Sequence, residues 1–330
     1  MSNRKLIELT EKILEGGDFR TSYEEACRLA ALPEDDTIDL IMCAGRIRRK
    51  YKGNRVVACS ITNAKSGLCT EDCAFCAQSA HHETGIEPYP LLSAQKILKD
   101  ARHLSEGGAT EFSMVTSGYA LTDQEMKMIC RAAGMIKEKT DLTLCSSLGI
   151  LTEERARQLK ESGVFTYHHN LETARSYFDK ICTTHDYEDD IQTVRAARAG
   201  GLKVCCGGIL GLGETWEQRV ELAVTLRDLD VDSIPINFLN PIPGTRMAER
   251  PLLSPMEALK CIALFRFVNP RKDITICGGR EITLRDLQSW IFAAGANGLL
   301  VGNYLTTQGR DINADMEMIK DLGLVAEKGV

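Results

Sequence analysis

A repeated order of strand, turn, helix and glycine from residue 56 onward is the feature that most limits how this chain can fold. Gly108, Gly163, Gly201 and Gly295 each stand between a helical run and the next apolar run, where a residue with positive φ ends a helix. Eight strand-then-helix units predict a (β/α)₈ TIM barrel. A doubly wound open sheet is the alternative, because counting units cannot show that the sheet closes.

The pattern divides the chain into a short helical part and a long repeating part. The predicted strands are 56–61, 111–115, 142–146, 164–168, 203–206, 233–237, 274–277 and 298–301. The predicted helices between them are 94–104, 125–136, 153–161, 191–199, 217–228, 256–267, 284–292 and 314–322. Residues 1–52 read as an N-terminal helical extension and residues 53–330 as the barrel, because no linker-like stretch divides the later part.

Composition excludes several classes of protein. The 40 basic and 46 acidic residues give a net charge of −6, which argues against a nucleic-acid partner. No apolar run reaches the ~18–20 residues of a membrane span, and the N-terminus lacks the apolar core of a signal peptide, so we expect a cytoplasmic protein. An odd count of 13 cysteines without an export signal indicates reduced thiols and points to metal or iron–sulfur ligation.

Three of these cysteines form a compact motif after the first predicted strand. Cys69, Cys73 and Cys76 have the spacing C-x₃-C-x₂-C in a stretch rich in Thr, Glu and Asp, which does not suit buried packing cysteines. The sequence therefore predicts that the three thiolates converge on one metal centre. A structural zinc site with His81 or His82 as the fourth ligand is one reading, and it would make the chain a zinc-binding interaction protein.

This spacing resembles the signature of the radical S-adenosylmethionine superfamily. Three cysteines leave one iron of a [4Fe–4S] cluster open, and in that superfamily the open iron binds the methionine part of S-adenosylmethionine. The resemblance implies that an electron from the cluster cleaves the sulfonium to a 5′-deoxyadenosyl radical. Phe75 matches the aromatic residue that the superfamily has before the last cysteine, where it is expected near adenine.

Longer stretches resemble the biotin synthase family, in order and without a missing block from about residue 56 to about residue 324. They are residues 65–68, 77–79, 167–173, 207–215, 236–245, 278–281, 294–297 and 305–307. The resemblance implies that dethiobiotin becomes biotin by insertion of sulfur between two unactivated carbons. A radical route suits this reaction, because acids and bases contribute only ~10²–10⁴-fold. It also implies a homodimer and an electron donor such as flavodoxin or ferredoxin.

The resemblance carries functional roles to individual residues. Those expected at the substrate are Lys65, Asn170, Asn237, Thr306 and Thr307, with the two asparagines on the ureido ring and the two threonines on the carboxylate. Those expected at S-adenosylmethionine are Phe75, Glu172, Gly208 and Ile209, with a side chain at Gly208 expected to obstruct the approach of adenine. For each asparagine the alternative is that it satisfies backbone groups at a strand end.

The sequence departs from the family at the auxiliary iron–sulfur cluster that would supply the sulfur. The better-known family members use three cysteines and one arginine, but here Ser113 and Thr275 stand at two of those positions, while Cys145 and Cys205 are kept. Cys277 follows Thr275 by two residues and shares its face of the strand. Cys59 aligns with a hydroxyl residue near that cluster.

Our hypothesis is therefore an auxiliary cluster, of four or two irons, held by four cysteines. The proposed ligands are Cys59, Cys145, Cys205 and Cys277. Cys206 is the alternative to its neighbour, since adjacent residues on a strand face opposite ways. The remaining cysteines are interpreted as packing residues, namely Cys27, Cys43, Cys130, Cys182 and Cys261. Asp190 is a second departure, because the family commonly has arginine there. A related radical enzyme, of the hydrogenase-maturation or amino-acid mutase type, is the functional alternative.

Overall fold

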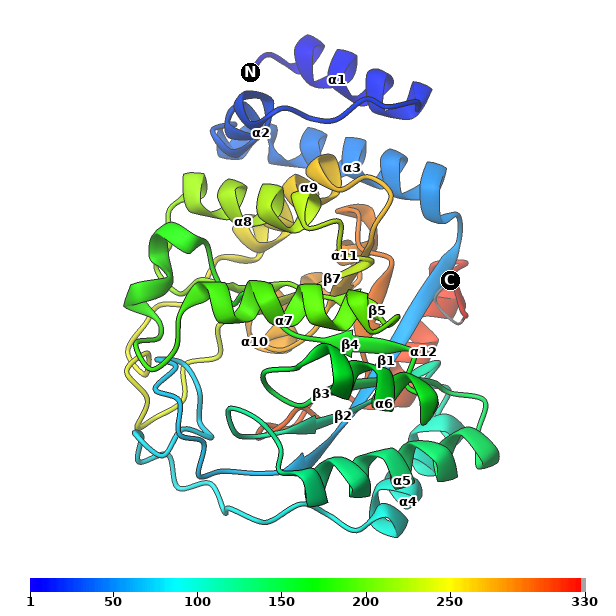
Figure 1. Cartoon of the computed structure of the whole chain (residues 1–330). Coiled ribbons are helices and arrows are strands. Elements are labelled where there is room, and N and C mark those ends of the chain that lie inside the picture. Colours follow the sequence, from blue (N-terminus) through cyan, green and yellow to red (C-terminus); the bar gives the residue numbers. More distant parts are fainter. Residues whose placement is uncertain (328–330) are drawn as a thin grey trace.

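The parallel sheet closes on itself. The computed structural model describes residues 1–327, and its strand β1 (Arg55–Lys65) pairs with β2 (Glu111–Thr116) on one side and with β9 (Gly298–Leu300) on the other. The chain is thus a (β/α)₈ barrel, and the open-sheet alternative is wrong (Figure 1). The fifth barrel position is split, because β5 (Lys203–Cys205) and β6 (Gly208–Leu210) both pair with β7 (Ser233–Phe238).

The remaining elements follow the predicted order closely. The other strands are β3 (Thr143–Ser147), β4 (Thr166–His168), β8 (Asp273–Ile276) and a short outer strand, β10 (Val325–Ala326), which pairs with β1. The surrounding helices are α4 (Ala94–Glu106), α5 (Asp123–Lys139), α6 (Glu153–Glu161), α7 (Tyr187–Ala199), α8 (Trp216–Asp228), α9 (Pro255–Val268), α10 (Arg280–Leu284), α11 (Trp290–Ala293) and α12 (Ile312–Asp321). Among residues 1–327, no helix combines the length and the apolarity needed to cross a bilayer.

Local sequence explains where the helices begin and end. Helix α5 starts at a capping box in which Thr122 accepts from the backbone N–H of Glu125, while the Glu125 carboxylate accepts from the N–H of Thr122. Helix α9 has Ser254 as its N-cap and Pro255 at its first position. Gly163 and Gly201, which follow α6 and α7, have positive φ of 104° and 84°, as a chain reversal into the next strand requires.

Alternation along the strands separates the core from the lumen. On β2, Phe112 and Met114 are fully buried and pack with the surrounding helices in the apolar core. The alternate residues of the same strand, Glu111, Ser113 and Val115, line the central cavity. The barrel therefore offers its polar and reactive side chains to one enclosed space and its apolar ones to the helices.

The first part of the chain is helical, as expected. Helices α1 (Asn3–Glu15), α2 (Tyr23–Ala30) and α3 (Thr37–Lys52) form layers beyond α8 and α9 in Figure 1, and α2 and α3 pack against those two helices. Their buried apolar side chains belong to the same continuous core as the barrel. The helical extension therefore has no separate core of its own among the described residues.

One predicted helix is wrong. The sequence predicts a single helix over 284–292, but the chain forms α10, a short 3₁₀ turn (Arg285–Leu287) and α11 instead. Arg285 has φ of +49°, which a continuous helix cannot contain. Helix α10 begins within the 278–281 motif, so the break lets this motif stay close to the barrel while the chain turns toward β9.

A buried ion pair fixes the last helix to the barrel, and we expect its loss to be costly. Arg280 donates to both carboxylate oxygens of Asp315, at 2.7 and 3.1 Å, and both side chains are fully buried. Asp315→Ala should lower the free energy of unfolding by about 3–5 kcal/mol, because the guanidinium loses its main partner inside the protein. Denaturant unfolding measures this loss.

The matched control is an exposed ion pair. Glu8 and Arg4 of α1 lie 2.9 Å apart with side chains that are mostly exposed. Glu8→Ala should change the free energy of unfolding by less than about 1 kcal/mol. Equal effects of the two substitutions would contradict the assigned role of the buried pair.

Candidate active site

A cavity of about 410 Å³ occupies the lumen of the barrel. Phe75 of the loop after β1 and Asn170 and Asn237, near the C-terminal ends of β4 and β7, line its mouth. Glu111 and Asp273, which begin their strands, line its deep end. Reactive groups of a (β/α)₈ barrel lie at the C-terminal ends of the strands, so the mouth is the candidate active site.

The cysteine motif lies in the loop after β1 and is held by a second loop from across the barrel mouth. The backbone N–H of Ala74 donates to the carbonyl of Ile181 at 2.8 Å, and Asp72 accepts from the N–H and hydroxyl of Thr183 at 2.8 and 2.7 Å. These bonds join segments more than 100 residues apart. They fix the backbone that carries Cys73 and Cys76.

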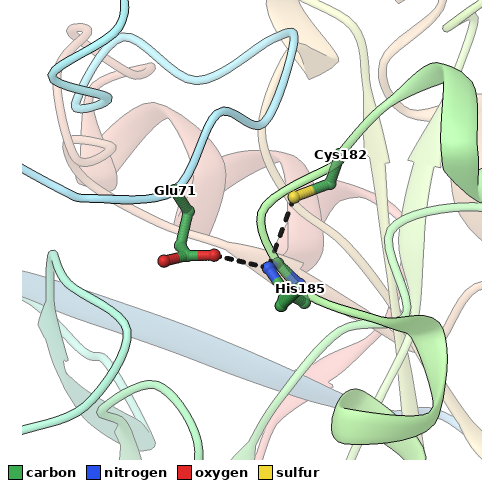
Figure 2. Close-up of side chains that lie close together, drawn as sticks. All are labelled: Glu71, Cys182 and His185. Carbon is green, nitrogen blue, oxygen red and sulfur yellow. Dashed lines mark hydrogen bonds and ion pairs between the residues drawn. The ribbon is translucent and has the colours of Figure 1, made fainter.

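Three side chains of these two loops meet in one place, shown in Figure 2. His185 Nδ1 lies 2.7 Å from a carboxylate oxygen of Glu71 and 3.3 Å from the sulfur of Cys182. The Cys182 sulfur also lies 3.9 Å from that of Cys73. Cys182 is buried in the apolar core, as the interpretation as a packing residue expects, and it also contacts the cysteine motif. In the sequence, the signal that could have predicted this contact was the short separation of Cys182 and His185.

The structural-zinc reading is disfavoured by the arrangement of the cysteines. Two thiolates on one tetrahedral zinc lie only ~3.8 Å apart, given Zn–S bonds of ~2.3 Å. Within residues 1–327, Glu71, Cys182 and His185 are the one group of three potential ligands whose atoms all lie within 4.8 Å of one another. Cys69, Cys73 and Cys76 are thus more widely spaced, as ligands of a polynuclear centre are.

Asp190 is held by two histidines. Its carboxylate lies 2.7 Å from His169 Nε2 and 3.6 Å from His185 Nε2, and it is 3% exposed. Burial alone would lower the pKa of His185, but its bonds to Asp190 and Cys182 outweigh burial and raise the pKa to about 11. His185 is therefore a largely buried cation between two carboxylates, with its side chain 11% exposed.

The polar residues expected at the substrate and the cofactor largely meet at the cavity mouth. Asn170, Asn237, Glu172, Thr306 and Thr307 all line the cavity. Asn237 Oδ1 accepts from the N–H of Gly278 at 2.9 Å, and its amide nitrogen donates to the carbonyl of Gly208 at 3.3 Å. The Asn237 amide is thus oriented by backbone groups. The two readings of this asparagine, backbone partner and ligand contact, are compatible.

Burial changes the protonation of two groups at the mouth. Burial raises the pKa of Glu172 to about 8, with a further contribution from the charge of Asp190. Burial lowers the pKa of His168 to about 4, so its ring is neutral at pH 7. The His168 ring nitrogen lies 2.9 Å from the side-chain oxygen of Asn170. The mouth is therefore lined by neutral hydrogen-bonding groups.

The structure differs from the prediction at two expected site residues, Lys65 and Gly208. Lys65 is not among the described residues that line the cavity, and its ammonium group lies 2.7 Å from the carboxylate of Glu125 on α5. A Cβ at Gly208 would lie 2.4 Å from the carbonyl oxygen of Glu172. Glycine is therefore required at 208 by the neighbouring backbone, independently of any bound adenine. Ile209 and Phe75 do line the cavity.

Four cysteines line the wall of the same cavity. Cys59, Cys145 and Cys205 lie on β1, β3 and β5, and Cys277 directly follows β8. Burial raises the pKa of each thiol, and the charges of the neighbouring cysteines raise it further for Cys59, Cys145 and Cys277. Cys206 points the other way and is fully buried in the apolar core. The cavity thus brings four thiols within electrostatic reach of one another.

Some polar atoms on the cavity wall have no partner in the protein. Among the described residues, the hydroxyls of Ser113 and Thr116 are buried without a hydrogen bond. Unpartnered buried hydroxyls are costly unless a bound group satisfies them. Ser113 and Thr275 both line the wall. The cavity therefore fits a polar or metallic guest beside the four thiols.

The buried cation predicts a pH dependence. The folded-state pKa of His185, about 11, lies above the value of about 6.5 expected when the chain is unfolded. Its contribution to stability is therefore complete below pH 6.5 and is lost as pH rises toward 11. In urea unfolding, the free energy of unfolding of the wild type should exceed that of His185→Gln. This difference should shrink across this pH range, by at most about 1.4 kcal/mol per pH unit. A difference in the free energy of unfolding that stays constant from pH 6.5 to 9 would contradict the assignment of His185 as a cation.

Two family models match the chain in sequence. Residues 65–226 match the Radical SAM superfamily, and residues 235–325 match the Biotin and Thiamin Synthesis associated domain. Both matches fall within the single barrel. The first contains the cysteine motif, and the second contains Cys277 and the 305–307 loop.

Curated relatives match nearly the whole chain. The chain is 61% identical over 312 residues to the biotin synthase of Syntrophus aciditrophicus, which covers 94% of this chain and 96% of the relative. It is also 56% identical over 310 residues to the biotin synthase of Nitratidesulfovibrio vulgaris strain Miyazaki F. This match covers 91% of this chain and 85% of the relative.

Solved structures confirm the fold. Methylornithine synthase superposes with a TM-score of 0.82 at 21% identity, covering 98% of this chain and 97% of that one. The hydrogenase maturase HydG superposes with a TM-score of 0.84 at 17% identity, covering 100% of this chain and 77% of that one. At these identities the likeness shows the fold alone. The curated relatives favour biotin synthase over the alternative of a hydrogenase-maturation or mutase type enzyme. The chain belongs to the biotin synthase family of the radical S-adenosylmethionine superfamily.

Proposed function

We propose that this chain converts dethiobiotin to biotin by a radical insertion of sulfur. The observation that carries the proposal is that one cavity joins three kinds of group. Cys76 and Phe75 of the cysteine motif and the amides of Asn170 and Asn237 line its mouth, and four thiols line its wall. Sulfur insertion at unactivated carbons needs a radical generator, a substrate clamp and a sulfur source within reach of one another.

The radical generator is proposed to be a [4Fe–4S] cluster held by Cys69, Cys73 and Cys76, with S-adenosylmethionine on its open iron. When bound, this pair supplies reductive cleavage of a sulfonium and hence abstraction of hydrogen from carbon. The spacing of the three cysteines supports a polynuclear centre. An apolar cluster of Ala74, Ile181 and Leu212, with Phe75 and Ile209 against it, offers a surface for adenine.

The substrate clamp is proposed to consist of neutral hydrogen-bonding groups. An amide side chain has both a donor and an acceptor, as a cyclic urea does, so Asn170 and Asn237 suit the ureido ring. The hydroxyls of Thr306 and Thr307 suit the carboxylate at the far end of the substrate. The partly exposed Lys65 is assigned a supporting position only, since its charge is already paired with Glu125.

The sulfur source is proposed to be an auxiliary iron–sulfur centre held by Cys59, Cys145, Cys205 and Cys277. Burial keeps free thiols protonated, but iron binds thiolates, so metal binding would release the protons and remove the desolvation cost of four charges. An electron donor such as flavodoxin or ferredoxin, a homodimer and a cytoplasmic location complete the proposal. The electron donor and the homodimer rest on the family resemblance.

The experiment that tests the function is an anaerobic assay. Reconstituted protein with dithionite, S-adenosylmethionine and dethiobiotin should form biotin together with 5′-deoxyadenosine. Formation of 5′-deoxyadenosine without biotin would contradict the substrate while sparing the radical chemistry. Absence of both products from fully iron-loaded protein would overturn the proposal.

The auxiliary ligand set makes a prediction about metal content. Cys277→Ala should lower the iron and sulfide bound per chain and remove part of the Mössbauer spectrum, because one of four thiolates is lost. Biotin formation should stop, while 5′-deoxyadenosine formation should continue. The matched control is Cys43→Ala, which alters a buried cysteine of α3 within the apolar core. If both variants keep the wild-type iron content and spectrum, the ligand set is wrong.

A further inference from the structure

One carboxylate shares the deep chamber with the four thiols. Glu111 is the first residue of β2, its backbone lies in register with Cys59 of β1, and its side chain lines the cavity. The thiol of Cys145 donates to a carboxylate oxygen of Glu111 across 3.9 Å. Cys59, Cys205 and Cys277 line the same cavity. Glu111 therefore contacts one of the four cysteines and shares the cavity wall with the other three.

The other acidic groups at this end of the cavity have cationic partners. Lys203 lies 3.1 Å from a carboxylate oxygen of Asp232, and Lys52 lies 2.7 Å from one of Asp273. For Glu111, the part of the chain that the structure describes contains no Lys, Arg or His within salt-bridge distance. The nearby Asp273 adds repulsion. A buried carboxylate without a counter-charge is unfavourable unless it is protonated or meets a cation.

The Glu111 carboxylate contacts the Cys145 thiol and faces the cavity. Iron bound by neighbouring thiolates would supply the missing positive charge, and ferrous and ferric iron both accept carboxylate oxygen as a ligand. The position of Glu111 on the wall, on the rung of Cys59, gives its oxygen access to the same space as the sulfurs.

We propose that Glu111 supplies an oxygen ligand to one iron of the auxiliary centre held by Cys59, Cys145, Cys205 and Cys277. The inference rests on the proposed function, since it needs that second centre. Four thiolates already complete the tetrahedral coordination of a two-iron or four-iron cluster, so the Glu111 oxygen would be an additional ligand that makes one iron different from the others. That iron would still have a protein oxygen ligand if the centre gave up a sulfur. Glu111 thus serves as a positioning residue for the sulfur source, on the side away from the substrate clamp.

The test compares two variants by Mössbauer spectroscopy of anaerobic protein reconstituted with ⁵⁷Fe. Glu111→Gln keeps the shape of the side chain and can still donate a hydrogen bond, but it removes the anionic ligand. The wild type should show a component with the higher isomer shift of an oxygen-ligated iron, equal to one iron per auxiliary centre. Glu111→Gln should lose that component and retain the signal of the [4Fe–4S] cluster. Asp273→Asn, which alters a carboxylate already paired with Lys52, is the matched control and should keep the component.

Each outcome bears on the inference. A Glu111→Gln spectrum identical to the wild type means that the Glu111 carboxylate is not a ligand of iron, and it overturns the proposal. Glu111→Ala is the second variant if the first fails to fold, and an unchanged spectrum overturns the proposal there too. A wild-type protein with only the [4Fe–4S] signal defeats the proposed auxiliary centre itself, whereas a second centre without an oxygen-ligated component defeats only the role of Glu111.

Discussion

Closure of the barrel by the pairing of β1 with β9 is the constraint on which the rest of the site depends. The pairing places Cys59 opposite Leu300, both with side chains on the cavity wall. Because strands alternate, every second residue of all the strands then faces one space that the helices seal from outside. An open sheet with the same sequence would spread Cys59, Cys145, Cys205 and Cys277 along one face, and they would not surround a common guest.

The mouth of the barrel depends on a second constraint, the docking of the cysteine loop on the 181–185 segment. Asp72 and Glu71 of the motif are bonded to Thr183, Thr184 and His185. The pairing of Glu71 and Asp190 with a protonated His185 links the cysteine loop to α7 through largely buried charges. Removal of His185 would leave Glu71 without this cationic partner, so the arrangement favours one loop geometry strongly.

The sequence predicted the parts of this structure that depend on local pattern. Period-two and helical spacing located all eight barrel strands, and the cysteine spacing located the motif, because both signals are carried by neighbouring residues. Strand alternation also separated Cys205 from Cys206, which the structure places on the cavity wall and in the core.

Features made by contacts between distant segments were not accessible from the sequence. The pairing of Lys65 with Glu125 and that of Glu71 with His185 join residues 60 and 114 positions apart, and no local pattern announces them. The break at Arg285 was missed for a related reason. Its flanking residues favour helix, but the backbone must turn there to let α10 and α11 reach the same barrel. Tertiary packing overrides propensity at that point.

The charge distribution along the cavity agrees with a reaction that moves hydrogen atoms rather than protons. At the mouth, the ring of His168 is neutral, burial raises the pKa of the Glu172 carboxyl to about 8, and the other groups named there are amides and hydroxyls, so no strong acid or base faces the proposed substrate. The deep wall instead carries four thiols, whose S–H bonds are weak enough to donate hydrogen atoms to a carbon radical. Free thiols there would quench the proposed chemistry. Ligation by iron removes those S–H bonds, so the same four cysteines suit a radical enzyme only when they hold a metal centre.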